Sequence, residues 1–453
     1  MTDAGFFFDQ ALTPVGWTRD VRLSVRDGVI VDVQPGAATQ PGDVRAALAL
    51  PGLCNLHSHA FQRGMAGLAE TRGPVGDTFW TWREVMYRFL DRLDPEMVEA
   101  ITALAFAEML EGGFTRVGEF HYLHQAPDGT PYADPAELTH RIAAAAADTG
   151  IALSFLPVFY AHADFGGAPP KPGQRRFIHD LDGFARLLEA TRADAKILPD
   201  ATLGVAPHSL RAVTPEELAV LTDLGAGGPM HIHAAEQDKE VDDCVAALGA
   251  RPVEWLLANA AVDMSWCLVH ATQMTPAETA GLARSGAVAG LCPITEANLG
   301  DGIFPSLDYL EAGGRFGLGT DSNIQIDAAA ELRALEYAQR LALKGRNVLA
   351  DAEGASTGVS LFQKALKGGA QALGAKAGFE VGAPADIVTL DANHPTLAAR
   401  TGEAIVDSWI FAAGREAVDG VWRRGRQVVA NGRHLKRPEI ARRYTTALRR
   451  LLA

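Results

Sequence analysis

The two ends of the chain alternate apolar and polar residues in the manner of half-buried β-strands. Residues 21–33 read VRLSVRDGVIVDV, and an Asp-Gly pair between two alternating runs is typical of a β-hairpin. Near the other end, residues 385–391 (ADIVTLD) and 417–432 (AVDGVWRRGRQVVANG) show short apolar runs interrupted by Gly or Asn-Gly. Both ends are therefore predicted to form strands.

Between the ends, short apolar runs alternate with longer segments of helical periodicity. Residues 94–113 read DPEMVEAITALAFAEMLEGG, where Asp94 is a good N-cap, Pro95 suits the first turn, and the paired glycines end the helix. The apolar runs read TRVGEF, IALSFLPVFY, ATLGVAPHS, GPMHIHAAE, WCLVHAT, AVAGLCP and RFGLGTDS. Such runs, separated by crossover helices, are typical of buried parallel strands. The sequence therefore predicts an α/β fold, a (β/α)8 TIM-like barrel.

Polar or ionisable residues follow each predicted strand, where a barrel of this kind carries its chemistry. His57 and His59 lie in LCNLHSHAFQRG, residues 53–64, directly after a Pro-Gly pair. Two residues apart on an extended segment, they project from the same side and can reach one metal ion. A solvated turn is the alternative, but the strand-like run before the pair favours metal binding.

Three later strand ends carry further ionisable groups. MHIHAAEQ contains His231, His233 and Glu236, and one of the two histidines is expected to be a metal ligand. LVHAT brings His270 to a strand end, and GLGTDSN brings Asp321 to another. Taken singly, a hydrogen-bonded core histidine and a helix cap are equally good interpretations of these two. The order His-x-His, His-x-x-Glu, His, Asp along successive strands is far more specific and favours a metal-dependent site.

Composition and charge narrow the class of partner. The chain has 453 residues, 48% of them hydrophobic and 21% charged, which is ample for a large folded core. A net charge of −14 disfavours nucleic acid and anionic membranes, so an anionic substrate would need a locally basic pocket. The sequence shows no signal peptide and no membrane-spanning run, and a cytoplasmic protein is expected. Without a Cys-x-x-Cys pair, the cysteines are expected to be buried thiols: Cys54, Cys244, Cys267 and Cys292.

The motifs resemble the amidohydrolase superfamily and, within it, the family of N-formimino-L-glutamate deiminases, over nearly the whole chain. The resemblance is carried by LPGLCNLHSHAFQRGMAGLAE, FWTWREVMYRFLDRLDPE, GFTRVGEFHYLHQ, GVAPHSLRAV, HIHAAEQ, LVHATQM and LGTDSNIQID. It implies a barrel over residues 51–381 and a small β-sandwich from residues 1–50 and 382–453, the latter with a C-terminal helix. It also implies a homodimer.

The resemblance further implies hydrolysis of N-formimino-L-glutamate to N-formyl-L-glutamate and ammonia, a step of histidine degradation, by metal-activated water. The implied ligands of one divalent ion, usually zinc, are His57, His59, His233 and Asp321. Glu236 and His270 then move protons with Asp321, and which of the three acts first stays open because their titrations are coupled. ATLGVAPHS lacks the bridging lysine of two-metal relatives, so one metal is expected. His231 is expected to be a neighbour or to support the ligand from behind.

Substrate recognition is expected to rest on the two carboxylates of a glutamate derivative, because a guanidinium group fits a carboxylate bidentately. The candidates are Arg83 and Arg211, supported by Tyr122 and His208, with Gln62 bonding the amide-like part of the substrate. For either arginine alone, a surface ion pair would be the usual interpretation. The Pro- and Gly-rich residues 166–176 are predicted to form a long loop, and whether it closes over the substrate stays open.

Three other functions remain alternatives. Deaminases of purines, pterins or triazines use the same metal set, but need a pocket shaped for a flat ring and no pair of arginines. Amide or carbamate hydrolases on this scaffold usually hold two metals. A catalytically inactive metal-binding barrel would need neither Glu236 nor His270.

Overall fold

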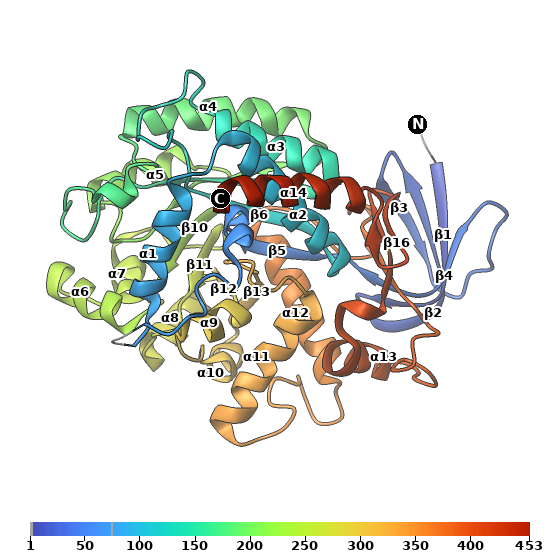
Figure 1. Ribbon diagram of the computed structural model, residues 1–453. Coiled ribbons are helices and arrows are strands. Elements are labelled where there is room, and N and C mark those ends of the chain that lie inside the picture. Colours follow the sequence, from blue (N-terminus) through green and yellow to red (C-terminus); the bar gives the residue numbers. More distant parts are fainter. Residues whose placement is uncertain (1–2, 74–75) are drawn as a thin grey trace.

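The computed structural model describes residues 3–73 and 76–453, which form a barrel with a smaller sheet beside it (Figure 1). Neighbouring barrel strands are parallel, and β13 pairs with β5. Bridges from Val205 and Ser209 to β10 link the last edge and complete the ring. The prediction of a TIM-like barrel is confirmed. The barrel strands in chain order are β5 (Leu53–Ser58), β6 (Phe114–His121), β7 (Ala152–Phe159), β8 (Thr202–Leu203) continued by β9 (Ala206–Pro207), β10 (Met230–Ala234), β11 (Trp266–His270), β12 (Val288–Leu291) and β13 (Arg315–Leu318).

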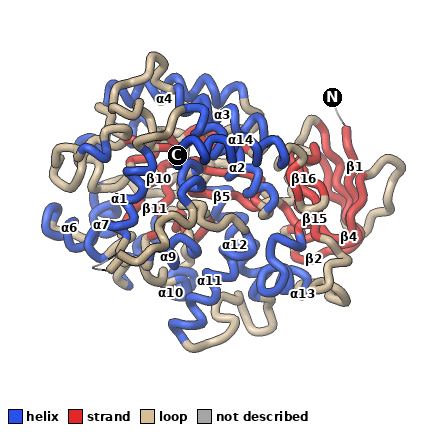
Figure 2. The backbone as a smooth tube through the Cα atoms, in the orientation of Figure 1, coloured by secondary structure: helices blue, strands red, loops and turns tan. Residues whose placement is uncertain are grey.

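Helices surround the barrel strands (Figure 2). They are α1 (Phe79–Leu90), α2 (Pro95–Glu111), α3 (Glu137–Thr149), α4 (Leu181–Ile197), α5 (Pro215–Leu224), α6 (Asp238–Leu248), α7 (Pro252–Asn259), α8 (Pro276–Ser285), α9 (Pro293–Leu299), α10 (Ser306–Glu311), α11 (Ala328–Leu343), α12 (Thr357–Ala372), α13 (Ala404–Ser408) and α14 (Arg437–Leu452). The helix predicted at residues 94–113 is α2, and the Asp94 carboxylate accepts a hydrogen bond from the Met97 amide at 2.7 Å. The C-terminal α14 packs along α2 (Figure 1) and joins it through Arg437, which pairs with Glu108 and Glu111.

The strand-rich ends of the chain form one sheet of eight strands. Its order is β17-β16-β15-β14-β4-β1-β2-β3. The strands are β1 (Asp3–Thr13), β2 (Gly16–Arg26), β3 (Val29–Gln34), β4 (Val44–Pro51), β14 (Ile387–Leu390), β15 (Val418–Arg423), β16 (Arg426–Ala430) and β17 (Arg433–His434). The predicted hairpin is β2–β3, whose turn residues Asp27 and Gly28 have φ of 51° and 82°, as the tight Asp-Gly hairpin turn requires. The two ends meet where β14 pairs with β4.

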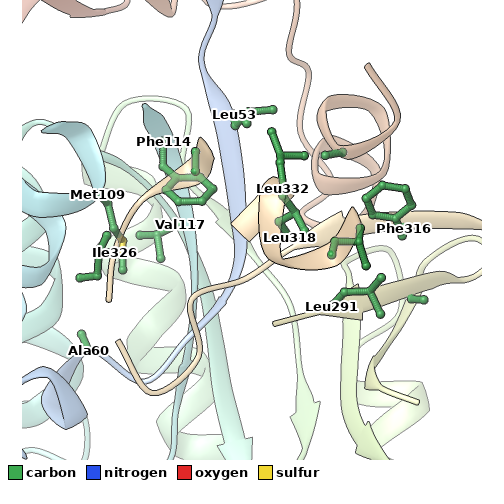
Figure 3. Packing of buried hydrophobic residues seen from close by; sticks show 14 of the residues in the cluster. Leu53, Ala60, Met109, Phe114, Val117, Leu291, Phe316, Leu318, Ile326 and Leu332 are labelled. Carbon is green, nitrogen blue, oxygen red and sulfur yellow. The ribbon is translucent and has the colours of Figure 1, made fainter. Parts of the chain in front are cut away.

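Apolar side chains fill the space between the barrel and its helices. Figure 3 shows part of this cluster, with Met109 of α2, Val117 of β6, Leu318 of β13 and Leu332 of α11. The four cysteines are buried and unpaired, as predicted. No helix in the described ranges is long and apolar enough to cross a membrane. The packed barrel supplies a rigid base for the strand ends.

We predict that Gly368→Ala destabilises the protein, because α12 lies close against β13 there. A Cβ at Gly368 would overlap with the carbonyl oxygen of Phe316, a backbone atom that cannot rotate away. Alanine normally favours a helix over glycine by about 1 kcal/mol, but the overlap should lower the free energy of unfolding by about 1–3 kcal/mol. Urea unfolding measures the change. Gly281→Ala in α8 is the control, since its Cβ meets only the tip of the Leu257 side chain at 2.9 Å, and an equal loss there would contradict the prediction.

Candidate active site

Strand pairing brings the predicted metal ligands to one point from distant parts of the chain. The His59 amide donates to the Asp321 carbonyl at 2.9 Å, and the Asp321 amide donates to the His57 carbonyl at 3.0 Å. On the other side of the barrel, the His233 amide donates to the His208 carbonyl at 3.0 Å. The pairing register of β5, β13 and β10 therefore fixes the backbone positions from which these side chains project.

The ligand atoms have the separations that a bound metal ion imposes. The Nε2 atom of His57 lies 3.2 Å from that of His59 and 3.1 Å from that of His233. Asp321 Oδ1 lies 3.2 Å from His59 Nε2 and 3.5 Å from His57 Nε2. Ligand atoms bound tetrahedrally at 2.0–2.1 Å lie about 3.3 Å apart. The set therefore fits one ion.

The charge state of these groups also suits a metal. His59 Nδ1 lies 2.8 Å from the Phe120 carbonyl oxygen, and His233 Nδ1 lies 3.0 Å from that of His208. A carbonyl only accepts, so each Nδ1 carries the hydrogen and each Nε2 keeps a lone pair for a metal. Burial lowers the pKa of His57 to about 3 and that of His233 well below its usual value, so both rings are neutral.

Asp321 completes the set as a carboxylate. Burial opposes its ionisation, but the adjacent His57 and His59 rings hold the pKa of Asp321 well below its usual value. Its φ of 42° lies in the left-handed region, which is uncommon outside glycine and is typical of constrained functional positions. Three imidazoles and one carboxylate form a donor set that divalent transition metals prefer.

Two proton-carrying groups stand beside the ligands. His270 Nε2 lies 3.7 Å from Glu236 Oε1 and 3.8 Å from Asp321 Oδ2, and its Nδ1 lies 3.3 Å from Glu296 Oε1. Burial raises the pKa of Glu236 to about 7. Burial disfavours a charged His270, but the charge of Glu236 and the hydrogen bond of Glu296 hold the pKa of His270 well above its usual value. An acid and a base thus face one another next to the ligand set.

One pocket gathers the predicted site residues. It lies at the carboxyl ends of the barrel strands and is lined by His59, Gln62, Arg83, Tyr122, His208, Arg211, His233, Glu236, His270 and Asp321. His57 lies behind this lining and is fully buried. Aromatic and apolar side chains form the rest of the wall: Phe79, Trp82, Met86, Tyr87, Tyr160, Phe177 and Leu299. The pocket is apolar except for the groups that the chemistry needs.

Two arginines of the pocket stand together over one indole ring. Arg83 of α1 and Arg211 of the loop after β9 have Cζ 4.5 Å and 5.7 Å from the centroid of Trp80. Neither forms an ion pair within residues 3–73 and 76–453, and the Nε of each is buried there without a hydrogen-bond partner. The nearby Glu240 instead accepts two backbone amides of the β10–α6 loop, at 3.3 and 3.0 Å. Two pocket cations without a carboxylate partner favour an anionic substrate.

The remaining polar groups of the pocket are Gln62, Tyr122 and His208. The Gln62 amide donates to the Tyr122 hydroxyl at 2.7 Å, which leaves its buried Oε1 without a partner among the described residues and able to accept a hydrogen bond from a ligand. Burial and, to a smaller extent, the positive charge of Arg211 lower the pKa of His208 well below its usual value, so this ring is neutral. Its Nδ1 lies 3.1 Å from the Ser209 hydroxyl.

His231 and the loop at residues 166–176 lie apart from the metal ligands. His231 Nε2 donates to the Ala372 carbonyl at 2.6 Å, so its ring packs toward the end of α12 and does not line the pocket. Within the loop, Gln174 donates to the Tyr160 hydroxyl at 2.8 Å, and Arg176 donates through Nε to the Gln125 carbonyl at 2.9 Å. The second half of this loop therefore supports the pocket wall.

Three residues that contribute to the site were not predicted from the sequence. Glu296 contacts His270, Trp80 lies under both arginines, and Tyr160 lines the pocket from the end of β7. A signal exists for Glu296, because it follows the apolar run AVAGLCP closely and so obeys the strand-end rule. Trp80 offers no such signal, since its role depends on how α1 packs.

Comparison with known proteins places this site in a family. The model of the amidohydrolase family matches residues 48–428, and that of the formimidoylglutamate deiminase HutF N-terminal domain matches residues 6–47. Formimidoylglutamate deiminase of Pseudomonas aeruginosa is 50% identical, covering 99% of this chain and 100% of the relative. An amidohydrolase crystal structure from Brucella melitensis has a TM-score of 0.96 and 52% identity, covering 99% and 100% of the two chains. An adenosine deaminase from Xanthomonas campestris with bound zinc has a TM-score of 0.81 and 25% identity, covering 99% and 98%.

Barrel, ligand set and pocket agree with these matches. The family model covers the barrel and, within the small sheet, β14, β15 and parts of β4 and β16. The separations and hydrogen bonds of the histidines are compatible with a metal site. The chain therefore belongs to the amidohydrolase family.

Proposed function

We propose that this protein is a formimidoylglutamate deiminase, which hydrolyses N-formimino-L-glutamate to N-formyl-L-glutamate and ammonia in histidine degradation. The observation that carries the proposal is the pair of unpartnered arginines beside a metal-ligand set in one pocket. A substrate with two carboxylates satisfies both cations, whereas a neutral flat ring would leave them unpaired. The full-length similarity to the Pseudomonas aeruginosa deiminase supports the same substrate.

Zinc is the proposed metal, held by His57, His59, His233 and Asp321. When bound, a divalent ion there lowers the pKa of water, so that water can attack the amidine carbon near neutral pH. The donor set of three imidazoles and a carboxylate suits zinc. The zinc-bound adenosine deaminase of similar fold supports this choice.

Protons pass through residues beside the ligands. Glu236, with its pKa raised by burial to about 7, delivers a proton to the imino nitrogen, so that the carbon–nitrogen bond breaks and ammonia leaves. His270, oriented by Glu296 through Nδ1, shares one proton with Glu236, and this pair takes up the proton that the attacking water loses. Asp321 lies 3.8 Å from His270 and shares this titration, so the proton belongs to a coupled group.

The pocket orients the substrate through its polar wall. Arg83 and Arg211 bind the two carboxylates, and Trp80 keeps the two guanidinium groups on one ring. The free Oε1 of Gln62 accepts a hydrogen bond from the amidine, while Tyr122 fixes the Gln62 amide. The neutral His208 contributes a further hydrogen-bonding group without adding charge.

Arg211→Met and Arg83→Met are each expected to weaken substrate use while leaving the metal in place. Losing a buried carboxylate contact typically costs about 2–5 kcal/mol, roughly 30-fold to several thousandfold in kcat/KM. Steady-state kinetics with N-formimino-L-glutamate measure the loss. Arg88→Met, at an exposed position of the same α1 helix, is the control and should leave kcat/KM unchanged. Wild-type kinetics in both test variants would exclude these arginines from substrate binding.

The reaction itself is tested by ammonia release from zinc-loaded protein on N-formimino-L-glutamate. Guanine and a free amidine without carboxylates are the comparison substrates, and metal analysis is made on the same sample. We expect turnover of formimino-glutamate alone. No turnover by a zinc-loaded sample would reject the substrate, and turnover of guanine would move the assignment to the ring deaminases.

We also propose that the enzyme works as a cytoplasmic homodimer on this small molecule, without nucleic acid or membrane. The resemblance on which the sequence interpretation rests implies the dimer. Light scattering of the purified protein tests it, with twice the mass of the 48.1 kDa chain as the expected result.

A further inference from the structure

Asp301 is a buried acid next to the proton-carrying residues, outside the pocket lining. Its side chain is held by the Gln237 amide, which donates to Oδ1, and its backbone carbonyl accepts from the Gln273 amide. Its own amide donates to the Glu296 carbonyl at 2.9 Å. These contacts hold the residue in a single place directly behind the pocket wall.

The other carboxylate oxygen of Asp301 is left unsatisfied. Asp301 is 3% exposed, and its Oδ2 is buried without a hydrogen bond to any described residue. One ligand atom each of Asp301, Glu236 and His270 lie within 4.8 Å of one another. Leaving a buried oxygen unsatisfied costs stability, and a role in the reaction is one explanation for keeping such an atom.

The surroundings of Asp301 favour the neutral acid. The charged and titratable groups that face it are Glu236, His270, Glu296 and Asp321. Of these only His270 supplies positive charge, and three carboxylates already compete for it. Burial and, to a smaller extent, the negative charge of Glu236 raise the pKa of Asp301 to about 9. The carboxyl therefore keeps its proton at neutral pH and can donate a hydrogen bond.

We propose that Asp301 is a positioning residue, a neutral carboxylic acid that donates a hydrogen bond to Glu236 once Glu236 has given its proton to the leaving nitrogen. A neutral donor stabilises the new carboxylate of Glu236, whereas an ionised Asp301 would repel it. Asp301 keeps its own proton throughout. The inference rests on the proposed role of Glu236 as the acid.

The test compares Asp301→Asn with Asp301→Ala in metal-loaded protein across pH 7 to 10. Asparagine keeps a neutral donor in the same place, so we expect kcat at pH 7 within about threefold of wild type, while alanine loses kcat roughly 10–100-fold with little change in KM. Wild-type activity should fall above about pH 7 as Glu236 loses its proton, and more steeply above about pH 9 as Asp301 ionises; Asp301→Asn should keep the first fall and lack the second. A merely structural role would not change the pH profile in this way.

Two results would overturn the inference. One is a loss in Asp301→Asn as large as in Asp301→Ala, which would mean that the negative charge is needed. The other is wild-type kcat in Asp301→Ala. Glu236→Gln is measured in parallel, because full activity in that variant would reject the role of Glu236 itself, whereas its loss beside an active Asp301→Ala would reject Asp301 alone. Metal content of every variant separates both cases from loss of the metal.

Discussion

His233→Ala should yield a protein that has lost its metal and its turnover together. His233 Nε2 lies 3.1 Å from His57 Nε2, and its other ring nitrogen is committed to the His208 carbonyl. Removing it takes away one of the four proposed protein ligands and leaves two imidazoles and a carboxylate, which should bind the ion much more weakly. The loss of kcat should exceed the roughly 10–100-fold that removal of an outer partner of a metal ligand typically costs. Asp321→Asn should behave in the same way.

The same strand supplies a matched control. His231→Ala removes an equally buried imidazole two residues away, but one that donates to the Ala372 carbonyl. We therefore expect normal metal content in His231→Ala, with at most reduced stability. Metal analysis after dialysis, alongside ammonia release, distinguishes the variants. Full zinc occupancy and turnover in His233→Ala, or metal loss in His231→Ala alone, would exchange the roles of the two histidines.

The histidine pairs of β5 and β10 differ in how far local spacing can predict their roles. The spacing of His57 and His59 follows from the two-residue period of a strand, so a shared metal can be inferred from their positions in the chain alone. The same period places His231 and His233 on one face and cannot choose between them. The choice depends on depth along β10, since the His233 amide pairs with His208 near the strand end, whereas His231 lies two residues deeper in the barrel.

Other parts of the site depend on contacts between distant segments. Asp321 could equally cap a helix on local grounds, and only the β5–β13 pairing brings it to His57 and His59. Arg83 lies on a helix with no local mark of function, so its prediction rests on the resemblance alone. Asp301 follows a short helix and carries no recognisable motif, because its environment is made by three other strand ends.

His270→Asn should keep the metal and lose most turnover, about 10²–10⁴-fold in kcat, the usual contribution of a general acid or base. His270 is outside the ligand set, and its Nε2 lies 3.8 Å from Asp321 Oδ2. Asparagine can still bond to Glu296, but its amide does not accept a proton near neutral pH. His124→Asn is the control, a buried histidine outside the pocket whose Nε2 donates to the Val158 carbonyl at 2.9 Å.

The proton held by His270 and its neighbouring carboxylates explains why this substitution should lower turnover. In the wild type, Glu236, Glu296 and Asp321 surround His270 and raise its pKa, so the group holds a proton over the neutral range and passes it on only as charge develops on the substrate. Without the imidazole, Glu236 and Asp321 must share that proton directly, and two carboxylates repel one another where His270 had separated them. Wild-type turnover in a metal-replete His270→Asn protein would assign the water proton to Asp321 or Glu236 and remove His270 from the reaction.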